Sequence, residues 1–124
     1  MIYLAVALGG ALGALSRYGI GQWLADSGYA HLHTATFLVN VIGALLVGVL
    51  FIGAERFTLS ESARLGMSVG FLGAFTTFSA FSLQLLTDIQ EGQVLRAVFY
   101  ASATVFLCLI SCLVGMELAR SVFD

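Results

Sequence analysis

Charged residues divide this chain into four apolar stretches, and their spacing restricts the possible fold more than any other feature. Runs with little or no charge cover residues 1–16, 34–54, 65–87 and 97–116, and the first extends to about residue 25 if Arg17 is accommodated. A helix needs about 20 residues to cross the hydrocarbon core of a bilayer, so each run can span it once. We therefore predict an all-α membrane protein, one domain over residues 1–124, with four transmembrane helices at about 2–25, 34–54, 60–87 and 94–120.

The composition excludes several classes of protein. The chain is 60% hydrophobic and only 10% charged, which is too apolar for a soluble domain of this length. It has no basic stripe that would indicate a nucleic-acid partner. It also lacks the HExxH, GxSxG and phosphate-loop motifs. We therefore expect a protein embedded in a lipid bilayer that is not an enzyme.

The third apolar run is unlike an inert lipid anchor. Gly66, Gly70 and Gly73 leave one helix side almost bare, which lets another backbone approach closely. Phenylalanines follow at spacings of four, three and three, so on a continuous helix they form one row: Phe71, Phe75, Phe78 and Phe81. By itself such a row is more often packing than a site.

Hydroxyl side chains lie among these phenylalanines. Two adjacent β-branched residues, Thr76 and Thr77, weaken a regular helix beside a glycine, and Ser79 follows them. Irregular backbone at membrane depth survives only against protein or a water-filled cavity. We therefore predict that the third helix is broken at its centre, and that ion chemistry is to be sought there.

Two polar residues interrupt the first two spans. The first span carries a GxxxG pair, Gly9 and Gly13, which predicts close helix packing. Its Arg17 either extends to the membrane surface or draws anions toward a pore. In the second span, Asn40 either joins helices or lines a polar path. The pattern alone leaves both pairs of alternatives open.

The connections and the fourth span add weaker signals. Because no third ligand lies nearby in the sequence, we interpret His31 and His33 as a solvated loop. Thr58 and Glu61 have the spacing of a capping box, which predicts a helix start near residue 59 or 60. The fourth span has a small or polar stripe that is a packing seam or an ion path: Tyr100, Thr104, Cys108, Ser111 and Gly115.

The apolar runs of the spans contain no acid before Glu117, which argues against proton-coupled export. The polar groups that remain in the spans are weak hydrogen-bond donors and the edges of aromatic rings. Such groups can bind an anion weakly enough to release it again, as conduction requires. Two alternatives stay open. One is a small multidrug-type carrier for an organic cation, with Glu117 or a partner subunit supplying the charge. The other is a non-conducting packing subunit.

Arginines are divided almost evenly between the two membrane sides, and the chain has no lysine. Arg56, Arg64 and Arg120 share a side, whereas Arg96 and possibly Arg17 lie on the other. Because this is a weak signal for orientation, the chain could insert both ways, and two copies could pair antiparallel.

Three motifs together resemble the Fluc, or CrcB, family of bacterial fluoride channels. They are GGALGALSRY at 9–18, FLVNVIG at 37–43 and, most specifically, GFLGAFTTFSAFS at 70–82. The resemblance covers nearly the whole chain. It implies an antiparallel, dual-topology homodimer in the bacterial cytoplasmic (inner) membrane, through which toxic fluoride leaves the cell down its gradient.

The resemblance also implies roles for individual residues. Phe78 and Phe81 would line the pore, with Asn40 as a hydrogen-bond donor. Gly73 and Thr76 would offer backbone carbonyls to a structural Na⁺ at the dimer centre. The remaining pore candidates are Thr77, Ser79, Tyr100, Thr104 and, near an entrance, Arg17. Family members often carry glutamate where this chain has Gln84, so a vestibule role for an acid is in doubt here, although the amide can still donate to an anion.

Overall fold

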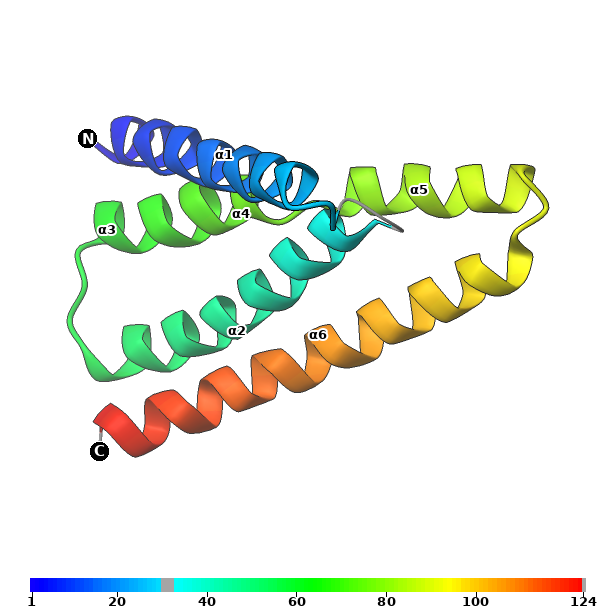
Figure 1. Ribbon diagram of the computed structural model, residues 1–124. Coiled ribbons are helices and arrows are strands. Elements are labelled where there is room, and N and C mark those ends of the chain that lie inside the picture. Colours follow the sequence, from blue (N-terminus) through cyan, green and yellow to red (C-terminus); the bar gives the residue numbers. More distant parts are fainter. Residues whose placement is uncertain (30–32, 124) are drawn as a thin grey trace.

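The computed structural model describes residues 1–29 and 33–123. Four helical segments in these residues are long and apolar enough to cross a membrane: Ile2–Asp26, Thr34–Arg56, Glu61–Gln90 and Val94–Phe123. This confirms the predicted all-α class with four candidate spans. Both termini and the connection between the second and third spans lie at one end of the molecule, as an even number of crossings requires (Figure 1).

The first helix, α1 (Ile2–Asp26), packs closely on the first half of the third span. An ideal Cβ built on Gly9 would lie 2.1 Å from the carbonyl oxygen of Gly66, and one built on Gly13 would lie 2.2 Å from that of Phe71. No real side chain tolerates such distances, so only glycine permits this approach. The predicted packing role of the GxxxG pair is confirmed.

The second helix, α2 (Thr34–Arg56), packs along the last helix, α6 (Val94–Phe123). Gly48 and Gly115 provide the close approach, because an added Cβ would meet a backbone oxygen of the facing helix at 2.1 and 2.2 Å. Ser111 Oγ donates to the carbonyl of Val41 at 2.9 Å. This end of the polar stripe on α6 is therefore a packing seam.

The third span consists of four helical pieces: α3 (Glu61–Leu65), the π-helical segment η1 (Gly66–Leu72), α4 (Gly73–Phe75) and α5 (Phe78–Gln90). Thr76 and Thr77 between α4 and α5 are extended, with ψ of 160° and 120°. The predicted central break is confirmed. The π-helical segment was not predicted; it lies where Gly66 and Gly70 press against α1, and such wide turns often mark functional sites.

The two ends of the third span differ from the prediction. Ser60 caps the helix, with its hydroxyl accepting from the amide of Ala63 at 3.2 Å, so the predicted capping box at Thr58 is wrong. The span ends at Gln90, three residues later than predicted, and thus includes Asp88. The inference that the spans hold no acid before Glu117 is therefore wrong as well.

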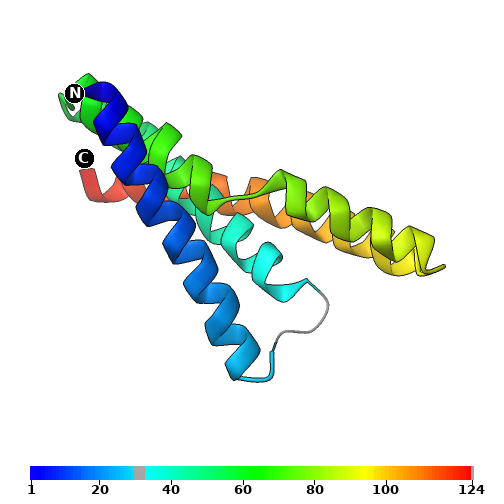
Figure 2. The same ribbon diagram turned by 90° about the horizontal axis from the view of Figure 1, so that it is seen from above.

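The break divides the molecule into two arms. Helix α1 lies along α3 and α4, whereas α5 lies along the first half of α6 (Figure 1). Seen from above, α1 and α5 extend in different directions (Figure 2). Few residues of α2 lie against α5. The position of α5 relative to α2 therefore depends on hydrogen bonds made by side chains.

Candidate ion-conducting site

The break in the third span is held open by Asn40 on α2. Its Nδ2 donates to the carbonyl oxygen of Thr77 at 2.9 Å, and its Oδ1 accepts from the backbone amide of Thr77 at 2.8 Å. The side chain therefore replaces both backbone partners that Thr77 would have in a continuous helix. Asn40 joins two helices, and it also lines a groove beside the break.

This exchange of hydrogen-bond partners also changes the surroundings of the backbone carbonyls of Gly73 and Thr76. The amides of Thr76 and Thr77 bind Leu72 and Asn40, so neither closes on the carbonyl of Gly73. The amide of Ala80 goes to Thr77 Oγ1 at 3.2 Å rather than to the carbonyl of Thr76. The carbonyls of Gly73 and Thr76 thus lose the amide partners that a regular helix provides.

Arg17 lies against the break. Its Nε donates to the carbonyl oxygen of Ala74 at 3.0 Å, and the side chain is only partly exposed. A guanidinium at membrane depth needs such a partner. The structure therefore gives Arg17 a third role that neither sequence interpretation included, as a donor to a backbone carbonyl beside the break.

Glycine also makes room for the extended threonines. An ideal Cβ on Gly43 would lie 2.1 Å from the methyl carbon of Thr76. Asn40 and Gly43 are nearly one turn apart on α2, so the same helix face binds one threonine and accommodates the other. This arrangement explains why both residues occur in the FLVNVIG segment.

Beyond the break, polar and aromatic side chains follow one stripe of α5 at spacings of four, three and four: Thr77, Phe81, Gln84 and Asp88. The polar members bind α2 at successive levels. Gln84 Nε2 donates to Thr36 Oγ1 at 2.8 Å, and Asp88 contacts His33 Nε2 at 3.1 Å. Together with the Asn40 pair, these links hold α5 against α2 in an antiparallel ladder.

Helix α6 forms the third wall. Tyr100 Oη donates to Gln84 Oε1 at 3.0 Å, and the Tyr100 ring lies edge-on to Phe81 with centroids 5.2 Å apart. One turn later, Thr104 is buried, and its Oγ1 has no hydrogen-bond partner within the described residues. We call the set Asn40, Thr77, Gln84, Tyr100 and Thr104 the polar file.

A groove of about 430 Å³ lies beside the polar file, between α2, the break and α6. Its lining includes the predicted site residues Asn40, Thr76, Thr77, Phe78, Phe81 and Thr104. Cys108 and Cys112 line its apolar side as free thiols. The structure therefore brings most of the predicted pore residues to one surface.

The phenylalanines do not form the single row expected for a continuous helix, because the break separates them into two pairs. Phe71 and Phe75 stack at 5.7 Å on one side, and Phe78 and Phe81 lie 5.6 Å apart on the other. Phe81 is 5% exposed, whereas Phe78 is 77% exposed at the edge of the groove. Ser79 is also exposed, with its Oγ 3.3 Å from Thr77 Oγ1.

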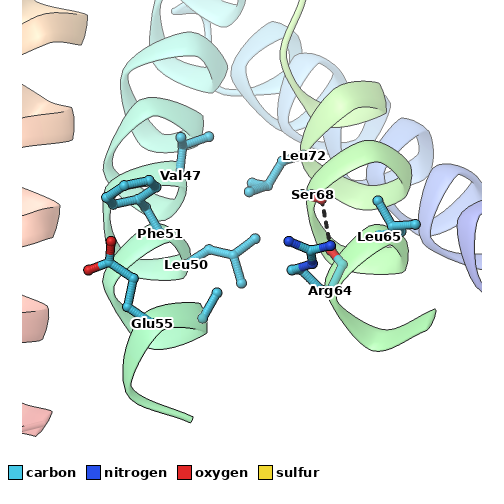
Figure 3. A pocket seen from close by; sticks show the side chains of 9 residues that line it. Val47, Leu50, Phe51, Glu55, Arg64, Leu65, Ser68 and Leu72 are labelled. Carbon is cyan, nitrogen blue, oxygen red and sulfur yellow. Dashed lines mark hydrogen bonds between the residues drawn. The ribbon is translucent and has the colours of Figure 1, made fainter. Parts of the chain in front are cut away.

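A second groove, of about 450 Å³, lies on the other side of the break between α2 and the arm formed by α3 and η1 (Figure 3). Its walls are mostly apolar, including Val47, Leu50 and Leu72, and Glu55 and Arg64 stand at its outer end. Ser68 donates to the carbonyl of Arg64 at 2.8 Å. None of the predicted pore residues lines this groove.

Three residues of the ladder were missed or misassigned from the sequence. Thr36 and Asp88 were not assigned a role, and His33 was interpreted as part of a solvated loop, which is wrong because it pairs with Asp88. His31 lies outside the described residues. The polar residues at 33, 36 and 40 lie on one face of α2, and those at 77, 84 and 88 lie on one face of α5; two such polar faces are the signal that could have identified them.

Comparison with known proteins shows which sequences this chain resembles over nearly its whole length. A family model described as "CrcB-like protein, Camphor Resistance (CrcB)" matches residues 4–116. A Thermus thermophilus protein named fluoride-specific ion channel FluC is 44% identical, over 94% of this chain and 91% of its own length. Proteins of the same name from Pseudomonas fluorescens and Acidobacterium capsulatum are 40% and 39% identical, over 96% and 98% of this chain and 97% and 98% of their own lengths.

Proposed function

The chain belongs to the CrcB-like family, and from this membership we propose that it is a fluoride-specific ion channel. It is a multi-pass membrane protein that lets cytoplasmic fluoride leave passively down its gradient and so protects the cell from fluoride toxicity. We place it in the cytoplasmic (inner) membrane of a bacterium.

The polar file is the observation that carries this proposal. Fluoride is strongly hydrated, so a channel must replace its water by donors that bind it weakly enough to release it. Hydroxyl and amide groups follow each other along the file, and Thr104 Oγ1 is buried and has no hydrogen-bond partner among residues 1–29 and 33–123. A free hydroxyl in that position is suited to donate to a partly dehydrated anion.

The two phenylalanines beyond the break suit the same ion. The rim of an aromatic ring carries partial positive charge, so an anion is attracted to ring edges without the tight binding of a buried arginine. Phe78 and Phe81 lie beside Asn40 and Thr77 at the groove. We assign them as the aromatic part of the fluoride path, with Ser79 at its edge.

We further propose that the channel is an antiparallel homodimer. Phe78 is 77% exposed in one chain, and Gly73 is also exposed, with no atom within 3.4 Å of an added Cβ. The arms on either side of the break are similar in length, so a two-fold axis through the break would lay each arm beside the opposite arm of the partner. The even division of arginines supports insertion in both orientations.

A Na⁺ ion at the dimer centre is also part of the proposal. Carbonyl oxygens are the ligands that hard cations prefer, and the carbonyls of Gly73 and Thr76 have lost their helical amide partners. Two such carbonyls from each chain would hold the ion. When bound, Na⁺ supplies positive charge that compensates these oxygens at the subunit interface.

A small multidrug-type carrier is the main alternative function. Such a carrier needs an acid that is free to exchange protons with cargo. Asp88 is a carboxylate within the third span, but its oxygens bind Arg96 and His33. This pairing favours the channel over the carrier.

Efflux from liposomes tests the proposal. Purified protein in fluoride-loaded liposomes should release fluoride rapidly, and Phe78→Ile or Phe81→Ile should slow the release. Phe106→Ile is a matched control, because Phe106 is 65% exposed on α6 and does not line the groove. Proton-coupled drug flux would favour the carrier instead, and neither flux would favour a packing subunit.

A further inference from the structure

A buried carboxylate lies at the far end of the polar file. Asp88 is 1% exposed, although its helix is otherwise largely open to lipid or to a partner chain. Its Oδ1 accepts from Arg96 Nη2 at 2.5 Å, and both of its oxygens lie within 3.2 Å of His33 Nε2. The three residues come from α5, α6 and the start of α2, so the cluster joins all three walls of the file.

This cluster is in direct contact with the file. The His33 ring lies on the ring of Tyr100, with centroids 5.1 Å apart. Tyr100 in turn donates to Gln84, which lies one turn before Asp88 on the same stripe of α5. A negative charge at Asp88 therefore acts on the part of the path where Tyr100 and Gln84 stand.

An uncompensated carboxylate in this position would oppose anion passage. Charges interact strongly where little water screens them, so a buried carboxylate that is ionised and lacks a cationic partner repels an anion. Arg96 supplies the matching positive charge, and Glu91 is the further acid that contacts it, at 3.3 Å. The contact with His33 links the same carboxylate to Tyr100.

We propose that Arg96 and His33 are positioning residues for conduction: Arg96 neutralises Asp88 and His33 holds Tyr100, so that this end of the file accepts an anion. This inference rests on the proposed function. It gives a role to three residues that no motif of the sequence includes. It also differs from a purely structural clamp, since charge balance rather than contact decides the flux.

Fluoride efflux from liposomes separates the two roles. We expect Arg96→Met to lower efflux about tenfold, equivalent to about 1.4 kcal/mol in the barrier, and to raise the half-saturating fluoride concentration. The double variant Asp88→Asn with Arg96→Met should return to within about twofold of wild type. A structural clamp alone predicts the opposite, because the double variant loses every contact of the pair.

Two further variants complete the test. Arg96→Lys keeps the charge and should conduct within about threefold of wild type, even if Arg96→Met fails to assemble. Arg120→Met removes an arginine that pairs with Glu117 on the same helix but lies away from the file, and it should leave efflux unchanged.

The possible outcomes have distinct meanings. If wild type does not conduct fluoride, the proposed function and this inference both fail. If wild type conducts but the double variant is as slow as Arg96→Met, or Arg96→Lys is as slow as both, only the inference is overturned.

Discussion

Replacing Asn40 by leucine should close the break that defines the site. The two side chains are similar in size, so packing changes little while both hydrogen bonds to Thr77 are lost. The amide of Thr77 would then be free to bind the carbonyl of Gly73, as in a continuous helix. We expect this repair to remove the carbonyls from the centre and to distort the polar file.

The magnitude follows from the two hydrogen bonds, which have lengths of 2.8 and 2.9 Å. Each typical intramolecular bond contributes about 1 kcal/mol net, and a buried group left without a partner costs about 1–3 kcal/mol. If Thr77 finds new partners, Asn40→Leu should destabilise the fold by about 2 kcal/mol. If it does not, the loss should approach about 4 kcal/mol.

Equilibrium unfolding in mixed micelles, followed by circular dichroism, measures this change, and fluoride efflux is measured on the same preparations. Ser111→Ala is the matched control, because it removes one bond from α6 to the backbone of α2 outside the groove. We expect it to cost about 1 kcal/mol and to leave efflux unchanged. The reasoning is refuted if Asn40→Leu is as stable as Ser111→Ala and still conducts.

Three other substitutions test separate parts of the structure. Gly13→Ala should force α1 away from η1 and cost about 1–3 kcal/mol in the same unfolding assay, whereas Gly21→Ala, with no atom within 4 Å, should cost nothing; equal effects would contradict the close packing. Gly73→Val should dissociate the dimer in size-exclusion chromatography while helical content is retained, and a dimer that persists would remove Gly73 from the interface. Arg17→Met should destabilise the fold by about 1.5–3 kcal/mol, because the carbonyl of Ala74 loses a charged donor; wild-type stability would show that this bond contributes nothing.

Much of the fold could be predicted because the bilayer imposes a simple rule on the sequence. The intervals between charges alone locate four spans. The break could be predicted because two threonines beside a glycine are a local signal of weak helix. The spacing of Gly9 and Gly13 likewise predicts close helix packing without any knowledge of the partner helix.

The partners that hold the break could not be predicted from local pattern. Asn40 binds a threonine 37 residues away, and His33 binds an aspartate 55 residues away. Such pairs appear only when α5 is placed against α2. The sequence predicts that His33 is solvated because its partner, Asp88, lies just beyond the predicted end of the third span.

The predicted row of phenylalanines depended on the assumption that the third helix is continuous. The spacing of four, three and three describes one face only if the helix is continuous. The predicted break contradicts that condition, and the structure separates Phe75, which is buried, from Phe78, which is exposed. Rotation at the extended residues Thr76 and Thr77 turns the second pair of phenylalanines away from the first.

Fluoride efflux through the purified wild-type chain tests the central claim most directly. Liposomes loaded with equal concentrations of fluoride and chloride are diluted into a medium free of both, and ion-selective electrodes record each release. We predict rapid release of fluoride with little release of chloride, abolished or strongly slowed by Asn40→Leu. Release of neither ion, or of both at equal rates, would contradict the account.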